Sequence, residues 1–230
     1  MSRPYRFALI GCGFFAQNHL QAWAEMPDVE LVATCDINPD SAAAAAETFG
    51  GTPYTDAAEL FAKKEVDFVD IATTPPTHRM MVELAAQHRV AAICQKPLAW
   101  DMDEAKAMVR AMADADQPFM VHENFRFQYP MRKVKEVLDS GVIGRPFFGR
   151  ISFRTAHDVY SAQPWCMDAE RMIIADVSVH QFDLTRFFLG EPDRLFTEAI
   201  RVNPKINCLL YTSDAADEGL GVDLGGRRII

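Results

Sequence analysis

Residues 5–36 read YRFALIGCGFFAQNHLQAWAEMPDVELVATCD, and this stretch indicates the fold of the first half of the chain. The apolar run 6–10 predicts a strand, the amphipathic segment 16–26 predicts a helix, and residues 30–36 predict a second strand. A GxGxxA pattern lies in the turn between the first strand and the helix. In this strand–turn–helix–strand context, the pattern indicates a dinucleotide-binding unit.

The residues of the turn each have a physical role in such a unit. Gly11 permits a tight turn, Gly13 lets the backbone approach a pyrophosphate, and Ala16 allows close packing of helix on strand. The free N–H groups at the start of the helix then point at the phosphates. We also count Phe14 and Phe15, in the same turn, among the cofactor-binding residues.

Asp36 ends the second strand, 20 residues beyond Ala16. A carboxylate at this position can accept hydrogen bonds from both ribose hydroxyls and would repel a 2′-phosphate. The sequence therefore predicts NAD as the cofactor in preference to NADP. The alternative is that Asp36 is simply a polar strand terminus.

Strands and helices continue to alternate up to about Asn124. Further strands are expected over 67–72, 90–94 and 119–122, and further helices over 41–49, 77–88 and 101–115. Asp40 or Ser41 is expected to cap the helix 41–49. This alternation predicts an α/β fold with a doubly wound parallel sheet.

The rhythm changes after Asn124. A helix is expected over 131–138, a turn over 141–146, a strand over 147–155, a helix over 176–189 and a strand over 194–202. Fewer helices and longer strands predict a second domain of α+β type. We expect a cofactor domain over 1–124 and a partial substrate domain over 125–207.

Composition excludes several classes of protein. The 230 residues are 49% hydrophobic and 24% charged, which is typical of a globular chain. With 32 acidic residues against 23 Lys and Arg, there is no basic face for nucleic acid. No apolar run is long enough to span a membrane. Five widely spaced cysteines fit neither a disulfide framework nor zinc spacing, so we expect a reducing cytoplasm and no metal site.

The chain resembles the Gfo/Idh/MocA family of sugar and cyclitol dehydrogenases. The resemblance rests on the glycine-rich turn, Asp36, the stretch TPPTH at 74–78 and QKP at 95–97. It implies a Rossmann domain, a mostly antiparallel second domain involved in substrate binding and oligomerisation, and a homo-oligomeric protein. The family tripeptide is usually Glu-Lys-Pro and brings its lysine to nicotinamide and substrate. Lys96 matches this pattern, whereas Gln95 departs from it and lacks the charge.

A second matching element is the stretch 176–180, DVSVH. The resemblance implies that Asp176 and His180 complete the active site with Lys96. Positions i and i+4 of a helix project from one face, so both side chains could reach one substrate. His180 would take a hydroxyl proton, Lys96 would hydrogen-bond the hydroxyl, and Asp176 would hold substrate hydroxyls or orient the base.

Other residues are weaker candidates. Thr74, Pro75, His78 and Gln95 are expected at the cofactor, although His78 could equally be a helix cap or a solvated side chain. Among residues that could bind substrate, Asn124 and Arg126 could instead make interdomain hydrogen bonds. The alternative for the third substrate candidate, Trp165, is core packing.

The sequence loses the family pattern from Cys208 onward. Residues 208–218 and 222–230 resemble a translated transposon-end sequencing adapter, in one reading frame and in adapter order. We therefore expect residues 208–230 to be a non-native tail on a C-terminally truncated chain. A genuine, variable C-terminus is the alternative.

These observations predict an NAD(P)-dependent oxidoreductase. It would transfer hydride from a secondary hydroxyl of a sugar, sugar acid or cyclitol to the nicotinamide. Two alternatives remain: a non-catalytic dinucleotide-binding or sensor protein, suggested by Gln95, and an inactive fragment of the dehydrogenase.

Overall fold

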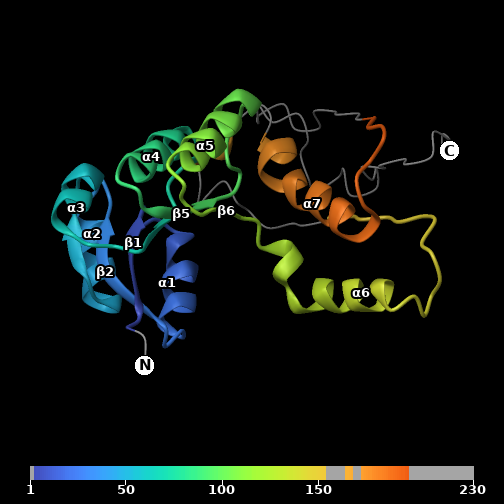
Figure 1. Cartoon of the computed structure of the whole chain (residues 1–230), viewed down its shortest axis with the longest axis horizontal. Coiled ribbons are helices and arrows are strands. Elements are labelled where there is room, and N and C mark those ends of the chain that lie inside the picture. The colour runs from blue at the N-terminus through green and yellow to red at the C-terminus, as the bar shows by residue number, and fades with distance from the viewer. Residues whose placement is uncertain (1–2, 154–163, 168–171, 197–230) are drawn as a thin grey trace. The chain divides into compact units, whose positions relative to one another are not determined.

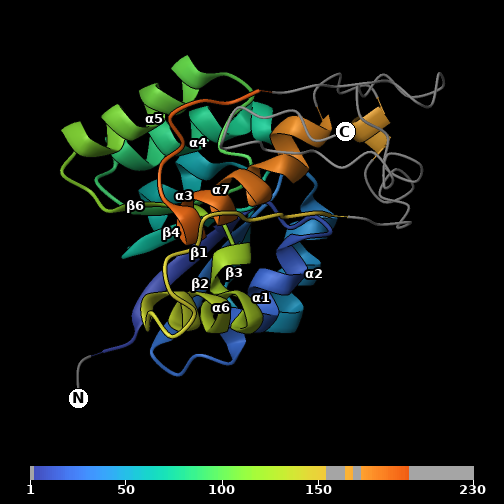
Figure 2. The same ribbon diagram turned by 90° about the vertical axis from the view of Figure 1, so that its right-hand side faces the viewer.

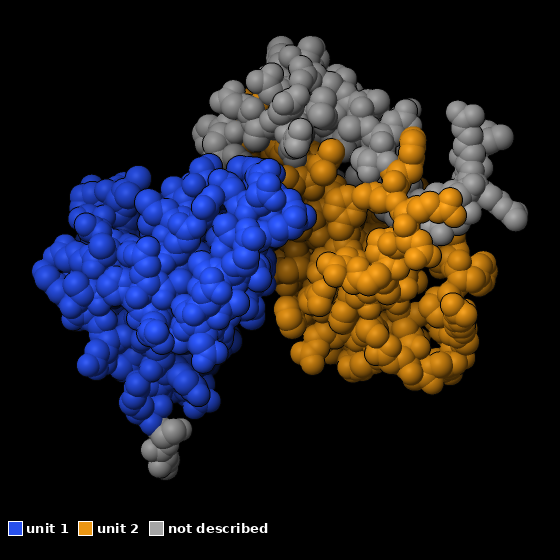
Figure 3. Space-filling model, turned by 45° about the horizontal axis from the view of Figure 1, so that its top comes forward, with its two compact units in different colours: residues 1–122 blue, residues 123–230 orange. Residues whose placement is uncertain are grey.

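The structure is a computed structural model and describes residues 3–153, 164–167 and 172–196. The chain divides into two compact units, residues 1–122 and residues 123–230, which are coloured separately in Figure 3. We call them unit 1 and unit 2.

Unit 1 is built on a six-stranded parallel sheet in the order β3-β2-β1-β4-β5-β6 (Figure 1). Its strands are β1 (Tyr5–Ile10), β2 (Val29–Cys35), β3 (Thr52–Tyr54), β4 (Phe68–Ile71), β5 (Ala91–Gln95) and β6 (Phe119–His122). Its helices are α1 (Ala16–Ala24), α2 (Pro39–Phe49), α3 (Ala57–Lys63), α4 (Pro75–Gln87) and α5 (Met102–Asp114). The predicted doubly wound parallel sheet is confirmed. The strand order reverses between β1 and β4, and ligands bind at such a switch point, beyond the carboxyl ends of the strands.

Alternate residues of β1 pack into separate apolar clusters on the two faces of the sheet. Ala8 and Ile10 belong to a cluster that α3, α4 and α5 complete. Leu9 belongs to a smaller cluster with Leu20 of α1 and Ala45 of α2. Figures 1 and 2 show α4 and α5 side by side over one face. Each fully buried Leu or Ile contributes about 1.5–3 kcal/mol, so both layers hold the sheet in place.

Helix starts in unit 1 are capped by short polar side chains. The carboxylates of Asp56 and Asp101 accept N–H groups in the first turns of α3 and α5. The cap of α2 is Asn38, whose side chain accepts the N–H of Asp40, and not Asp40 or Ser41 as predicted. The helix begins earlier than expected because Pro39 is well suited to a first helical position.

Unit 2 contains the predicted helix 131–138 as α6 (Tyr129–Asp139), followed by a turn in which Gly141 and Gly144 have positive φ. The predicted helix 176–189 is α7 (Ser178–Leu189), which continues from a π-helical turn, η3 (Ile173–Val177). Two short 3₁₀ turns are η1 (Phe125–Phe127) and η2 (Pro164–Met167). None of the described helices is long and apolar enough to cross a membrane.

The predicted strand 147–155 is wrong in its described part. Residues 147–153 have no regular secondary structure, and the Phe147 side chain is 99% exposed. A strand needs a neighbouring backbone for its hydrogen bonds, and the described residues of unit 2 include no other strand. The predicted strand 194–202 is also not formed over residues 194–196, and its remainder lies outside the described residues.

Candidate active site

The turn between β1 and α1 has the geometry of a pyrophosphate cradle. Gly11 has a φ of +92°, and a Cβ there would lie 2.7 Å from the Ala72 carbonyl carbon, so only glycine fits. A Cβ on Gly13 would have no heavy atom of the described residues within 4 Å, which leaves open space beside the backbone. Ala16 is buried against Leu9, which brings α1 close to the sheet.

The start of α1 is left available for an anion. Within the described part of unit 1, no side chain caps this helix and no acidic residue lies in its first turn. Its first N–H groups can therefore be satisfied by phosphate oxygens. Phe14 and Phe15 are exposed in the same turn.

The Asp36 carboxylate ties the glycine-rich turn to the end of β2. Its Oδ2 accepts the Cys12 backbone N–H at 2.7 Å, and its Oδ1 accepts the Asn38 N–H at 2.8 Å. A carboxylate oxygen has two lone pairs, so both oxygens retain capacity for a ribose hydroxyl. The neighbouring Cys12 thiol stays protonated near neutral pH, because burial raises its pKa to about 12.

Lys96 directly follows β5 and is half-buried. Its backbone N–H donates to Oε1 of Gln95 at 2.6 Å, and its peptide bond to Pro97 is cis. On the adjacent strand, β4 leads to Thr74, which is exposed at the start of α4, and to the buried Pro75. Parallel strands end at the same edge of a sheet, so these residues share an edge with the glycine-rich turn.

His78 requires a correction. Its side chain is 0% exposed, and its ring nitrogens lie 3.1 Å from the Leu98 carbonyl oxygen and 3.0 Å from that of Thr73. Burial lowers the pKa of His78. The ring has no surface left for a cofactor, so we assign it a role in bracing the loops after β4 and β5.

In unit 2, His180 of α7 is held by two neighbours. Its Nδ1 lies 2.7 Å and 2.9 Å from the two carboxylate oxygens of Glu123, and its ring stacks on Phe125 at a centroid distance of 3.8 Å. A carboxylate only accepts, so Nδ1 carries a proton, and in the neutral form of the ring the lone pair is on Nε2. This is the arrangement of an oriented general base.

Asp176 lies in the π-helical turn that precedes α7 and is half-buried. The prediction that Asp176 and His180 lie four apart on one regular α-helix is therefore corrected: the hydrogen bonds of this turn run from i to i+5. Such π-helical turns occur frequently at functional sites.

Arg126 is committed to an ion pair within unit 2. Its Nε donates to Asp183 Oδ2 at 2.7 Å, its second nitrogen donates to Oδ1, and its guanidinium lies 5.2 Å from the Phe187 ring centroid. The hydrogen bond to Asp183 raises the pKa of Arg126. This clamp joins η1 to α7 and gives Arg126 a structural role within unit 2, while the expected substrate contact stays a prediction.

The remaining predicted substrate residues are less defined. The Oδ1 atom of Asn124 is buried with no hydrogen-bond partner among the described residues, so it can still accept one. Trp165 lies in η2, and its side chain is outside the described part of the structure. In the residues the structure describes, no group of three or more His, Cys, Asp or Glu could hold a metal ion.

Comparison with known proteins decides the family. Residues 5–123, just over half of the chain, match the Gfo/Idh/MocA "Oxidoreductase family, NAD-binding Rossmann fold", and residues 131–222 match a GFO/IDH/MocA C-terminal domain. The chain belongs to the Gfo/Idh/MocA oxidoreductase family. The resemblance inferred from the sequence is thus confirmed, together with the NAD-binding character of its first domain.

Individual Gfo/Idh/MocA relatives agree. A D-apiose dehydrogenase of Rhizobium rhizogenes is 52% identical over 200 residues, which cover 86% of this chain and 58% of that protein. An inositol 2-dehydrogenase of Rhizobium meliloti is 32% identical and covers 81% and 55% of the two chains. An oxidoreductase from Agrobacterium radiobacter, solved with NAD+, L-tartaric acid and magnesium, is 51% identical with a TM-score of 0.86, covering 89% and 60%. The chain spans less than two thirds of the length of these relatives.

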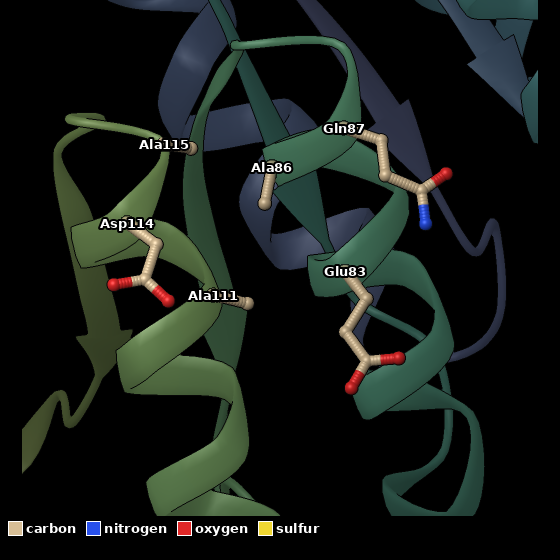
Figure 4. A pocket seen from close by; sticks show the side chains of 6 residues that line it. All are labelled: Glu83, Ala86, Gln87, Ala111, Asp114 and Ala115. Carbon is tan, nitrogen blue, oxygen red and sulfur yellow. The ribbon is translucent and has the colours of Figure 1, made fainter.

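Unit 1 of this Gfo/Idh/MocA chain also has a surface hollow. It lies between the ends of α4 and α5 (Figure 4) and is lined by Glu83, Ala86, Gln87, Ala111, Asp114 and Ala115. Both helices end where the chain enters the next strand, so the hollow is at the amino edge of the sheet. The glycine-rich turn is at the carboxyl edge, and the hollow is therefore no part of the nucleotide site.

Sequence reasoning missed several residues that the structure brings together. Glu123 was not expected at His180, although its position directly after the last strand of the sheet is a signal for a site residue. His19 and Asp70 were also missed. Both side chains are buried, and His19 Nδ1 lies 2.9 Å from Asp70 Oδ2.

Proposed function

We propose that the protein is an NAD-dependent dehydrogenase that oxidises a secondary hydroxyl of a sugar, sugar acid or cyclitol to a ketone. The observation that carries the proposal is the Glu123–His180 pair, which holds the imidazole in one orientation in a chain with an NAD-binding domain. Relatives named as D-apiose and inositol dehydrogenases support this class of substrate.

The cofactor would be held by residues whose surroundings fit it. Gly11, Gly13 and the start of α1 would take the pyrophosphate, with Phe14 and Phe15 beside it, and Asp36 would take the ribose. When bound, NAD supplies the nicotinamide ring that accepts hydride from the substrate carbon. Thr74, on the exposed side of the same sheet edge, is a further contact for it.

His180 would act as the general base. Its Nε2 lone pair takes the proton of the reacting hydroxyl, and the imidazolium that forms is stabilised by the Glu123 carboxylate at Nδ1. Stacking on Phe125 fixes the plane of the ring, so the lone pair keeps one direction. The Lys96 ammonium would hydrogen-bond the same hydroxyl, and Asp176 would hold a neighbouring one.

Turnover and binding measurements on the same variants test these roles. With NAD+ and a panel of sugars, sugar acids and cyclitols, we expect Lys96→Ala and His180→Ala to lower kcat at least a hundredfold with little change in NAD affinity. Lys106→Ala, on the exposed face of α5, is the matched control and should keep full activity.

Two results would contradict the proposal. Full activity in both Lys96→Ala and His180→Ala would remove the assigned roles. NAD binding without turnover on any substrate of the panel would favour the alternative of a non-catalytic dinucleotide-binding protein.

We further propose that residues 1–124 form the cofactor domain and residues 125–207 the substrate domain of a cytoplasmic homo-oligomer. The division of the chain into compact units after His122 supports the first boundary. Sedimentation of the purified protein would test the oligomeric state, and a monomer at all concentrations would contradict it.

A further inference from the structure

A buried cluster of polar side chains lies beneath the end of β5 in unit 1. Asp70 comes from β4, Gln95 ends β5, His122 ends β6, and His19 comes from α1. Asp70 is 1% exposed, and His19 and Gln95 are also buried. Buried polar groups are in most cases hydrogen-bonded to one another, and here Asp70 Oδ1 is an exception with no partner among the described residues.

The direction of each hydrogen bond follows from one fixed donor. The Lys96 backbone N–H can only donate, so the Gln95 atom 2.6 Å away must be the amide oxygen. The Gln95 NH2 group then faces Nε2 of His19 at 3.0 Å and must donate to it. Nε2 therefore carries a lone pair, and the proton of the ring resides on Nδ1.

The other end of the cluster agrees with this assignment. Nδ1–H of His19 donates to Asp70 Oδ2 at 2.9 Å, and the Trp23 indole, which can only donate, reaches the same oxygen at 2.7 Å. His122 Nδ1 also lies near this atom, 3.1 Å from His19 Nε2. Asp70 Oδ2 thus accepts two N–H groups, Oδ1 has no hydrogen-bond partner among the described residues, and His19 is neutral.

We propose that Asp70, His19 and Gln95 form a relay that positions Lys96, in which Gln95 holds the Lys96 backbone through Oε1 and keeps His19 neutral through its NH2 group. Gln95 is then a positioning residue and not the cofactor ligand expected from the sequence. The importance of positioning Lys96 rests on the proposed function, whereas the hydrogen-bond directions do not.

In this relay, the side chain at position 95 determines how many protons the buried cluster holds. In a Gln95→Glu variant, a carboxylate oxygen would face the Nε2 lone pair of His19, and two acceptors cannot hydrogen-bond. One extra proton must enter, on His19 or on the new carboxyl. The titratable groups facing His19 among the described residues are Asp70 and His122, and Cys94 of β5 lies near Asp70.

Unfolding as a function of pH measures this extra proton. Free Glu and His titrate near ~4.3 and ~6.5, so the unfolded variant has released the proton above about pH 6.5 while the folded variant retains it. Stability is therefore fully present below about pH 6.5 and is lost as the pH rises towards the folded pKa. We expect the unfolding constant of Gln95→Glu, relative to the unsubstituted chain, to rise about tenfold per pH unit in this range.

The control is Gln21→Glu, which adds the same charge on the exposed side of α1. It should show no such pH dependence relative to the unsubstituted chain. If Gln95→Glu and Gln21→Glu follow the same curve between about pH 6.5 and 9, the relay is overturned. Imidazole ¹⁵N shifts of the unsubstituted protein provide a second measurement that needs no variant: a protonated Nδ1 and bare Nε2 on His19 support the relay, and the opposite tautomer or an imidazolium overturns it.

The positioning of Lys96 by Gln95 is tested separately, by measuring kcat. Gln95→Met removes the acceptor for the Lys96 N–H, whereas Gln95→Glu keeps one. We expect Gln95→Met to lower kcat at least tenfold with KM for NAD unchanged, and Gln95→Glu to restore kcat near pH 6. An unchanged kcat in Gln95→Met would overturn the positioning role. Absence of turnover in the unsubstituted protein would overturn the proposed function, while the tautomer and pH results would still decide the relay.

Discussion

The same substitution at the two glycines of the first turn should change different properties. Gly11→Ala should lower stability, and Gly13→Ala should lower NAD affinity. Gly11→Ala requires an alanine at a φ of +92°, which costs about 1–2 kcal/mol. Its Cβ would also lie 2.7 Å and 2.8 Å from the backbone carbonyl carbon and oxygen of Ala72, and backbone atoms cannot rotate away. Overpacking of this kind costs about 1–3 kcal/mol, so we expect a total loss of about 2–5 kcal/mol.

Gly13→Ala meets nothing within 4 Å among the described residues and should change stability by less than about 0.5 kcal/mol. Its methyl group would instead occupy the space through which the pyrophosphate approaches. We expect NAD affinity to fall about tenfold or more, which is roughly 1.4 kcal/mol.

Urea unfolding followed by circular dichroism, together with calorimetric titration of NAD+, separates the two effects. Gly11→Ala should lower the urea midpoint, and Gly13→Ala should lower the affinity at an unchanged midpoint. Equal destabilisation by both substitutions would refute the packing argument. Unchanged NAD affinity in Gly13→Ala would refute the location of the pyrophosphate.

Two further substitutions test the ribose contact and the base. Asp36→Ala should weaken NAD binding by more than it weakens NADP binding, because it removes the ribose acceptor and also the charge that repels a 2′-phosphate. Titration with both cofactors measures the two affinities. A larger loss of NADP affinity would contradict the ribose contact. In Glu123→Gln, the amide can donate an N–H to Nδ1 of His180, which favours the tautomer that has its proton on Nε2. Steady-state kinetics should then show a kcat about 10²–10⁴-fold lower at unchanged NAD affinity. Retention of full kcat would remove Glu123 from the mechanism.

Most of unit 1 could be predicted because its elements carry local signals. Apolar runs of strand length alternate with amphipathic helices, and Asp101 marks the start of α5. β3 and α3 were missed, since a three-residue strand and a seven-residue helix are too short for a clear period. The signal for α3 was nevertheless present: Asp56 caps the helix, and Glu59 follows three residues later.

Unit 2 was harder to predict because its structure depends on distant partners. The aromatic run around Phe147 favours a strand by composition, yet residues 147–153 have no paired backbone among the described residues. The helix of His180 was predicted from its own periodicity. Its contact with Glu123 could not be, since those two residues are separated by 57 positions and only the fold brings them together.

The role of Gln95 also depends on residues that are distant in the sequence. The sequence showed the loss of a charge beside Lys96, but it could not show that His19 and Asp70 complete a buried cluster with the amide. That cluster forms because neighbouring parallel strands end in register, with Gln95 opposite His122. Residues at strand ends are therefore the ones whose roles needed the structure.

Deuterium transfer tests the proposed reaction most directly. A sugar or cyclitol that supports turnover is labelled with deuterium on the carbon that carries the reacting hydroxyl, and the reduced nicotinamide is analysed by mass spectrometry. We predict that the label appears in the reduced cofactor, and that His180→Ala abolishes this transfer while NAD still binds. Reduced cofactor without the label would contradict hydride transfer from that carbon.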